Sequence, residues 1–174
     1  AALIPQRELY QDRFIILSAG RYSDVDGPWA PHSLTIRREH ECAHYFTRRA
    51  FGSMRNTLVD ELIADYMGIV AASGRYRADW FLHFLGLEDY PRCRADGRIH
   101  NYRGTPRLSD GAFAIAQSVV VRAARNVEQW DAALPPGPRA HAFDAAVITT
   151  LARAGLEGMA SPHAQSLLEA GIAA

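Results

Sequence analysis

The sequence predicts a mainly helical fold, organised as a single domain over residues 1–174. Apolar residues recur at three- and four-residue spacing in several segments, and those segments are bounded by Gly, Pro and Ser. A chain of 174 residues also suits one domain, which would bury roughly 68–70% of its unfolded surface. No internal repeat or linker divides the chain, so a single, mainly helical domain is the simplest interpretation.

The secondary structure of the N-terminal part of the chain has two possible interpretations. The run Arg13–Ser18 fits either a short buried strand or the end of a helix, because periodicity alone does not separate these two. The fold prediction therefore includes a possible short N-terminal strand or minimal sheet. Residues 24–33 contain Gly27-Pro28 and Pro31, and we expect them to form a loop.

Two helices are expected in the centre of the chain. The first covers about residues 33–51 and stops at Gly52, and the second covers residues 57–72 and ends at Gly74, since glycine often follows the last helical residue. The short break between them lets the second helix fold back antiparallel to the first. A shorter helix follows at 78–85.

The remaining segments are expected to be one long loop and three helices. Residues 88–107 read as a polar loop, and a loop of this length in a compact domain is often functional. Helices are expected at 110–130 with Ser109 as its cap, at 140–154, and at 162–170 between Ser161 and a stop at Gly171.

The chemical signal lies in the first central helix, at His40-Glu41-Cys42-Ala43-His44. In a helix, His40 and His44 are about 40° and about 6 Å apart, so both imidazoles reach one ion. A catalytic zinc commonly takes three protein ligands and leaves one position to water. Glu41 is placed to take a proton from that water.

The second central helix offers the missing ligand. Glu61 lies 17 positions after His44, and its carboxylate would complete a His, His, Glu set for Zn²⁺. Asp65 shares the helix face of Glu61, where it could accept a hydrogen bond from a ligand histidine and fix its orientation. Asp60 reads instead as part of an acidic first helical turn.

The pair of motifs, His40-Glu41-Cys42-Ala43-His44 and Glu61-Leu62-Ile63-Ala64-Asp65, resembles the gluzincin class of zinc metallopeptidases over roughly residues 37–70. The resemblance implies that His40, His44 and Glu61 are metal ligands, Glu41 is the general base and Asp65 supports a ligand histidine. It implies a zincin-like domain, with an active-site helix and an antiparallel ligand helix, and a peptide or protein substrate. It also implies a Tyr, His or Arg that stabilises the oxyanion, which no motif here identifies.

The long loop contains one hypothesis for that missing group. His100, Tyr102 and Arg103 lie close together in the sequence, and any of them could stabilise the oxyanion if the loop crosses the active-site cleft. The alternative is an ordinary solvated turn, since polar residues are expected in loops.

Other residues are given structural interpretations. Cys42 points away from the metal on a helical wheel and is expected to be a small buried packing residue, and Cys93 lies in the polar loop with nothing to mark it as reactive. His83 is expected in or beside the core. The remaining histidines lie near helix starts without a second-ligand pattern: His32, His141 and His163. A di-iron site would need a second E-x-x-H pair, which the sequence does not contain.

Composition narrows the partners. The formal net charge is zero, so no basic field favours nucleic acid, and no stretch approaches the ~20 apolar residues of a membrane span. All 19 basic residues are Arg, which excludes a catalytic lysine. Two cysteines make no disulfide framework, so a reducing, cytoplasmic location is expected. Oligomeric state is not predicted.

Three functional hypotheses follow. The leading one is a zinc-dependent hydrolase of the metallopeptidase type, with Glu41 as general base. The second is a helical domain that binds metal without turnover and serves an interaction or regulatory role. The third is a purely structural helical domain without bound metal.

Overall fold

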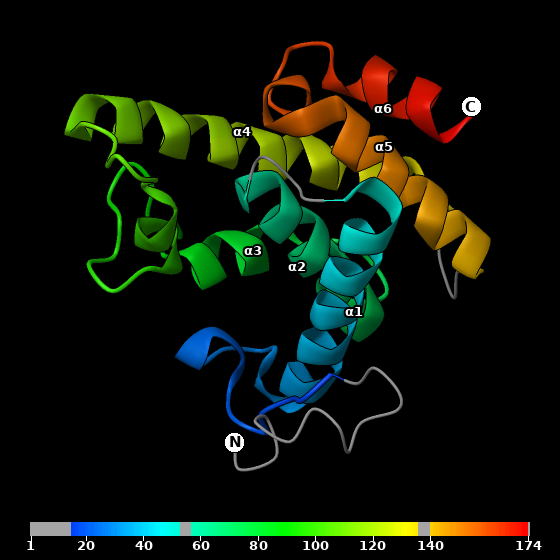
Figure 1. The fold of residues 1–174 in the computed structure, drawn as a ribbon, viewed down its shortest axis with the longest axis horizontal. Helices are drawn as coiled ribbons and strands as arrows, with labels where there is room; N and C mark the ends of the chain where they lie inside the picture. Colours follow the sequence, from blue (N-terminus) through cyan, green and yellow to red (C-terminus); the bar gives the residue numbers. More distant parts are fainter. Residues whose placement is uncertain (1–14, 53–56, 136–139, 174) are drawn as a thin grey trace.

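The computed structural model describes residues 15–52, 57–135 and 140–173, and within these ranges the chain is mainly helical (Figure 1). This confirms the predicted fold class. The helices are α1 (Ser33–Phe51), α2 (Thr57–Ser73), α3 (Ala78–Leu85), α4 (Asp110–Ala133), α5 (His141–Met159) and α6 (Ala164–Ile172). Short 3-10 helices also occur in the described ranges, namely η2 (Tyr22–Asp24), η3 (Ala30–His32) and η4 (Arg98–Tyr102).

The possible N-terminal strand is not found in the described part of the chain. Residues 15–18 of the ambiguous run form neither strand nor helix, and Arg13 and Phe14 lie outside the described residues. Instead, the Arg37 guanidinium on α1 donates hydrogen bonds to the carbonyls of Ser18 and Gly20, at 2.8 and 2.9 Å. A side chain therefore takes the place of a strand partner for this segment.

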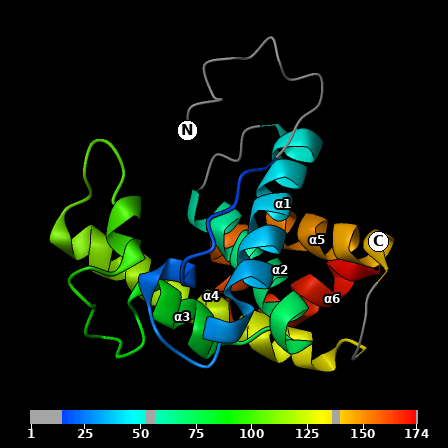
Figure 2. The ribbon, with the colours of Figure 1, turned by 90° about the horizontal axis from the view of Figure 1, so that it is seen from below.

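Helices α1 and α2 pack antiparallel along their length (Figures 1 and 2). The contact is close because Gly68 on α2 lies against the backbone of α1: a Cβ built on Gly68 would be 2.7 Å from the Ile36 carbonyl oxygen. Both helices end where predicted. Gly52 and Gly74 adopt φ of 76° and 79°, a region that residues with a Cβ rarely occupy.

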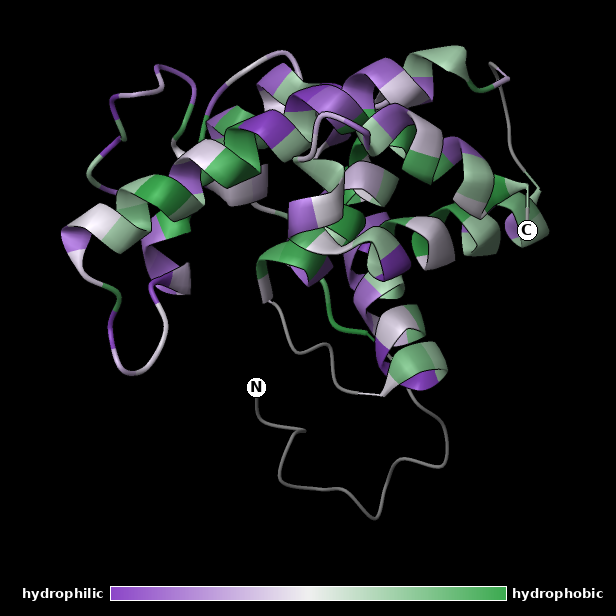
Figure 3. Cartoon of the chain, turned by 90° about the horizontal axis from the view of Figure 1, so that it is seen from above, coloured by the Kyte–Doolittle hydropathy of each residue, from purple (hydrophilic) through white to green (hydrophobic). Residues whose placement is uncertain are grey.

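The other helices pack mainly on the α2 side of this pair, because α3 and α5 contact α2, and α4 and α6 pack in turn against those helices. In Figure 1, α4 lies along the top of the view, α5 and α6 pack at one end of it, and the loop between α3 and α4 forms the opposite end. Each helix carries both hydrophobic and hydrophilic residues along its length (Figure 3). The apolar sides meet in one core, whose largest fully buried side chains include Trp130, Tyr66, Phe81 and Phe84.

The last two helices differ from the predicted bounds. The helical geometry of α5 breaks at Gly155 (φ 64°, ψ 176°), one residue after the predicted end, and then resumes to Met159. Helix α6 begins at Ala164 and continues through Gly171, so the predicted stop there is wrong. A Cβ on Gly171 would lie 2.6 Å from the Thr150 side chain, so this glycine permits close packing of α6 on α5.

The segment between α3 and α4 contains η4 and is otherwise irregular, as predicted for the long loop. Ser109 caps α4 by accepting a hydrogen bond from the Ala112 amide at 3.2 Å. Among the described residues, none of the helices is both long enough and apolar enough to cross a membrane.

Candidate metal centre

The centre begins with two imidazoles on α1. His40 and His44 lie one helical turn apart, and their Nε2 atoms face each other at 3.0 Å. The side chain of His40 is 8% exposed and that of His44 13%, so both rings are largely removed from solvent. The i, i+4 spacing read from the sequence therefore produces two converging ring nitrogens.

Helix α2 adds a carboxylate to the same point. The Glu61 oxygens lie 3.8 Å from His40 Nε2 and 3.7 Å from His44 Nε2. Within the described ranges these three residues are the one group of histidine, cysteine and acidic side chains whose ligand atoms gather closely enough to hold a metal, all within 4.8 Å of one another. Tetrahedral ligands at zinc distances of 2.0–2.2 Å lie roughly 3.3–3.5 Å apart, so small side-chain movements would fit them to one ion.

Both imidazoles are oriented from behind by carboxylates. His40 Nδ1 lies 2.8 Å from Asp65 Oδ1, and His44 Nδ1 lies 2.9 Å from Asp60 Oδ2. In the neutral ring, each Nδ1–H donates a hydrogen bond to its carboxylate. The Nε2 atom then carries no proton, and its lone pair is free to bind a cation. Two lone pairs 3.0 Å apart repel each other, and a cation between them removes that repulsion.

Asp60 has a role that sequence analysis missed. It lies in the first turn of α2, as expected, but its carboxylate also accepts hydrogen bonds from His44 and, at 2.8 Å, from the Thr47 hydroxyl. Burial alone would lower the pKa of His44, but the hydrogen bond and charge of Asp60 outweigh it and raise that pKa. The usable signal was the antiparallel pairing, which brings the start of α2 beside the end of α1.

The Asp65 side chain is fully buried, and the positive charge of Arg98 stabilises its ionised carboxylate. Burial alone would raise the pKa of its carboxyl, but the Arg98 charge and the hydrogen bond from His40 outweigh it and lower the pKa to about 2. The Tyr22 hydroxyl donates to Asp65 Oδ1 and lies 2.7 Å from His40 Nδ1. Sequence analysis identified Asp65 but neither Arg98 nor Tyr22, because no local spacing links them to the motif.

Two further side chains border the ligands. Glu41 follows His40 on α1, is half-buried, and its charge contributes to the raised pKa of His44. Tyr102, the last residue of η4, is also half-buried. Burial, together with the charge of Glu61 and a hydrogen bond to it, raises the pKa of the Tyr102 hydroxyl despite the opposing charge of Arg98. Tyr102 is therefore a neutral hydrogen-bond donor at physiological pH.

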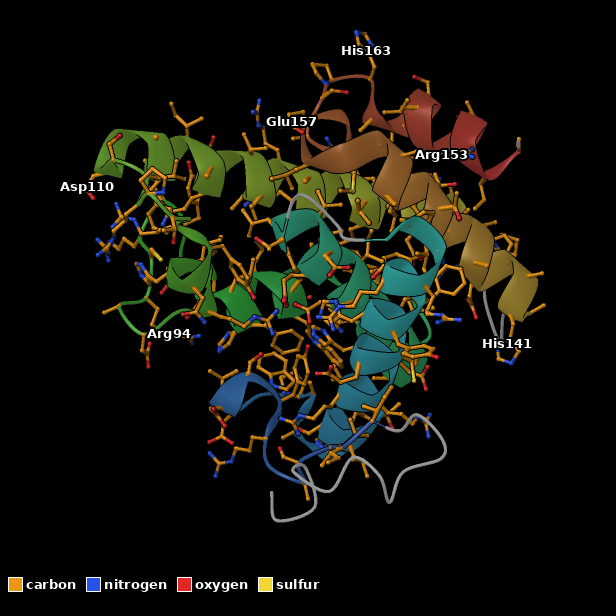
Figure 4. The ribbon with its side chains drawn as sticks, in the orientation of Figure 1. Arg94, Asp110, His141, Arg153, Glu157 and His163 are labelled. Carbon is orange, nitrogen blue, oxygen red and sulfur yellow. The ribbon has the colours of Figure 1, made fainter. Side chains whose placement is uncertain are left out.

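The other two loop candidates are held elsewhere. His100 Nε2 lies 3.2 Å from the Arg94 carbonyl oxygen, and its ring packs beside Phe113 on α4. Arg103 bonds to Asp110 at 2.6 Å, and Figure 4 shows Asp110 at the outer end of α4. Of the three loop candidates, Tyr102 thus lies beside the candidate ligands, whereas His100 and Arg103 make contacts within the loop and with α4.

Comparison with protein families gives the chain a relationship but no activity. A family model matches residues 1–163, which is most of the chain. The chain belongs to a family of unknown function, DUF7005. No curated protein and no solved structure matches it. The chemistry of this DUF7005 member must therefore be argued from its own residues.

The remaining cysteines and histidines stay outside the centre. Cys42 is not part of the group of candidate ligands, and it is exposed, so its interpretation as a buried packing residue is wrong. Cys93 is partly buried against the core. His83 is half-buried beside Trp29 at the edge of the core, as expected. His141 and His163 are exposed at the outer edges of the molecule (Figure 4).

Proposed function

We propose that this protein is a zinc-dependent hydrolase whose metal is bound by His40, His44 and Glu61. The observation that carries the proposal is the convergence of two Nε2 atoms 3.0 Å apart, with a carboxylate at 3.7–3.8 Å from both. In each ring the other nitrogen, Nδ1, is hydrogen-bonded to an aspartate. This arrangement leaves electron pairs pointing into one small space, as a divalent cation requires.

Zinc is the metal that this donor set favours. Two imidazoles and one carboxylate, with room for one more ligand, are typical of catalytic zinc sites. The local charge agrees, because the carboxylates at the centre outnumber the guanidinium groups of Arg48 and Arg98 that act on them: Glu41, Asp60, Glu61 and Asp65. A bound zinc would polarise a carbonyl oxygen and acidify water.

The protein side chains can then be given roles in hydrolysis of an amide bond. Glu41 accepts a proton from the attacking water as the water oxygen bonds to the carbonyl carbon. The carbon–nitrogen bond breaks, and Glu41 returns the proton to the departing amine. Tyr102 bonds to Glu61 in this structure, and in the reaction its hydroxyl turns from Glu61 to donate a hydrogen bond to the carbonyl oxygen as negative charge develops there.

A peptide is the substrate that the resemblance to gluzincins favours. Enzymes of that kind hold an extended peptide by strand pairing, yet no strand is found in the part of the chain that the structure describes. This observation supports a second candidate, a metal-binding domain without turnover that serves an interaction or regulatory role. The two candidates make different predictions for Glu41.

The first experiment measures zinc content by elemental analysis in the native chain and in His44→Ala. The hydrolase proposal expects about one zinc per chain in the native protein and loss of that zinc in the variant. Absence of zinc from the native protein after purification in zinc-containing buffer would refute both metal-binding candidates.

The second experiment separates catalysis from metal binding. Glu41→Gln should retain its zinc and lose about 10²–10⁴-fold in hydrolysis of a peptide library, because the proton acceptor is gone. Glu39→Gln is the matched control, since Glu39 pairs with Arg38 on the surface of the same helix and should keep full activity. If the zinc-loaded native chain cleaves nothing in the library and Glu41→Gln keeps every cellular effect, the non-catalytic candidate is correct.

A further inference from the structure

We propose that Arg98 is a positioning residue of the metal centre, which locks the carboxylate behind His40 and aligns the ligand Glu61. The proposal rests on the zinc site proposed above. It extends that site beyond the α1–α2 pair, because Arg98 belongs to η4 in the long loop. It also gives a function to a half-buried charge that no sequence motif identified.

The contacts of the Arg98 guanidinium converge on the centre. Its Nη2 donates to Asp65 Oδ2 and lies 3.7 Å from Glu61 Oε2. Its Nη1 donates to the Ser23 hydroxyl at 3.2 Å. One planar cation therefore touches the partner of one ligand and approaches another ligand directly, as a rigid guanidinium fork is suited to do.

Arg98 and Tyr22 together fix both oxygens of the Asp65 carboxylate. Oδ1 lies 2.8 Å from His40 Nδ1 and also accepts a hydrogen bond from the Tyr22 hydroxyl. Oδ2 accepts a hydrogen bond from Arg98. A carboxylate held at both oxygens cannot rotate freely. The His40 ring that bonds to it is held in one plane, with its Nε2 aimed at the ligand cluster.

The same arginine also braces the segment that supplies Tyr22. Ser23 and Asp24 follow Tyr22, and both adopt a φ of 55°, a left-handed conformation that residues other than glycine rarely occupy. Such conformations persist where surrounding contacts hold them. Arg98 bonds to Ser23 and lies over the Tyr22 ring, 5.9 Å from its centroid. Its contacts thus hold the turn that delivers the tyrosine hydroxyl to Asp65.

An arginine that only stabilised the loop would not have to contact Asp65 or Glu61, and a second arginine in the loop shows this. Arg94, in the same loop, pairs with Glu88 and Asp96 at 3.0 and 3.1 Å and bonds to the His83 carbonyl, so it braces the loop without touching a proposed ligand. Arg98 instead donates its hydrogen bonds to Asp65 and to Ser23, in the turn that follows Tyr22. The comparison between the two arginines therefore separates support of the loop from alignment of the metal centre.

The test compares Arg98→Met and Arg98→Lys with the control Arg94→Met. Zinc affinity is measured by chelator competition, and ligand geometry by the visible absorption spectrum of the protein loaded with Co²⁺ instead of zinc. Circular dichroism and melting of the metal-free proteins show that each variant is folded at the assay temperature. Arg98→Met should bind zinc about 10–100-fold more weakly and show an altered cobalt spectrum. Arg98→Lys should recover part of the affinity through its charge, and Arg94→Met should match the native protein.

The outcomes distinguish this inference from the proposed function. Native-like affinity within twofold and a native cobalt spectrum in folded Arg98→Met would overturn the inference and leave the zinc site standing. Failure of the native chain to bind zinc would overturn both. Should Arg98→Met fail to fold, Arg98→Lys decides: a changed spectrum supports the positioning role, and native affinity with a native spectrum overturns it.

Discussion

The two histidines proposed as ligands are supported in different ways. His40 bonds to Asp65, which is fully buried and held by Arg98 and Tyr22. His44 bonds to Asp60, whose side chain is 14% exposed and whose other partner is the Thr47 hydroxyl. Changing the first support would disturb a buried charge cluster. The second can be altered with much less effect on folding, so it tests the metal centre more cleanly.

Asp60→Asn should weaken zinc binding by about tenfold, because the neutral amide accepts the His44 Nδ1 proton less strongly and orients the ring less firmly. The cost in unfolding free energy should stay near ~1 kcal/mol or less, since Asp60 lies at the edge of the core. Chelator competition measures the affinity and urea denaturation the stability. Asp96→Asn, at an exposed loop position, serves as the control; equal affinities in the two variants would contradict the role of Asp60.

Sequence spacing was enough to predict part of the site. His40, His44, Glu61 and Asp65 follow helical periodicity within two adjacent helices, and the structure brings them together. Tyr22 and Arg98 could not be found in this way. They come from short 3-10 helices, 18 residues before His40 and 33 residues after Asp65, and only the tertiary fold brings them to the centre. Zinc binding itself stays a prediction.

At the scale of the elements, the centre depends on how closely α2 approaches α1. Gly68 lies on α2 at this contact, and it has no side chain to separate the backbones. The ligands belong to both helices, so the distance between the helices also sets the distance between Glu61 and the two imidazoles. Packing and metal geometry are therefore linked through one glycine.

Gly68→Ala should destabilise the protein by about 1–3 kcal/mol, because the added methyl group would lie 2.7 Å from the Ile36 carbonyl oxygen and force the helices apart. Zinc affinity should fall with it. Gly111→Ala is the matched control: this exposed α4 position has nothing within 4 Å of an added Cβ, so alanine should stabilise the helix by about 0.5–1 kcal/mol. Chemical denaturation of both variants checks the prediction, and an equal effect at the two positions would refute it.

Helix positions were largely predictable because their ends carry local signals. Gly52 and Gly74 end α1 and α2 through their own backbone freedom, and Ser109 caps α4 through its hydroxyl. Gly171 carried the same signal but lies inside α6, where close packing against Thr150 requires a small residue. A glycine needed for packing and a glycine needed for a turn look alike in sequence, so the error arose from a tertiary contact.

For the molecule as a whole, the core is independent of the proposed metal. The buried apolar residues extend through all six described helices, so we expect the chain to fold without the ion. Zinc should then act as a ligand that binds to an already folded protein. This differs from small zinc domains, in which removal of the metal unfolds the chain.

Addition of zinc should raise the melting temperature of the metal-free protein. Free zinc at about 100 times its dissociation constant contributes about 2.7 kcal/mol, which corresponds to roughly 5–10 °C for a chain of this size. Scanning calorimetry measures the shift. His44→Ala should remain folded and show no comparable increase, whereas an equal increase in this variant would place the zinc elsewhere.

All three proposed ligands come from one helical hairpin, and this matters for protein design. Transplanting α1 and α2 into another scaffold would carry both imidazoles, the glutamate and the aspartates that orient the rings. It would leave behind Arg98 and Tyr22, and Asp65 would enter the new scaffold as a buried anion without its counter-charge. A working graft must therefore supply a cation of its own behind the first histidine.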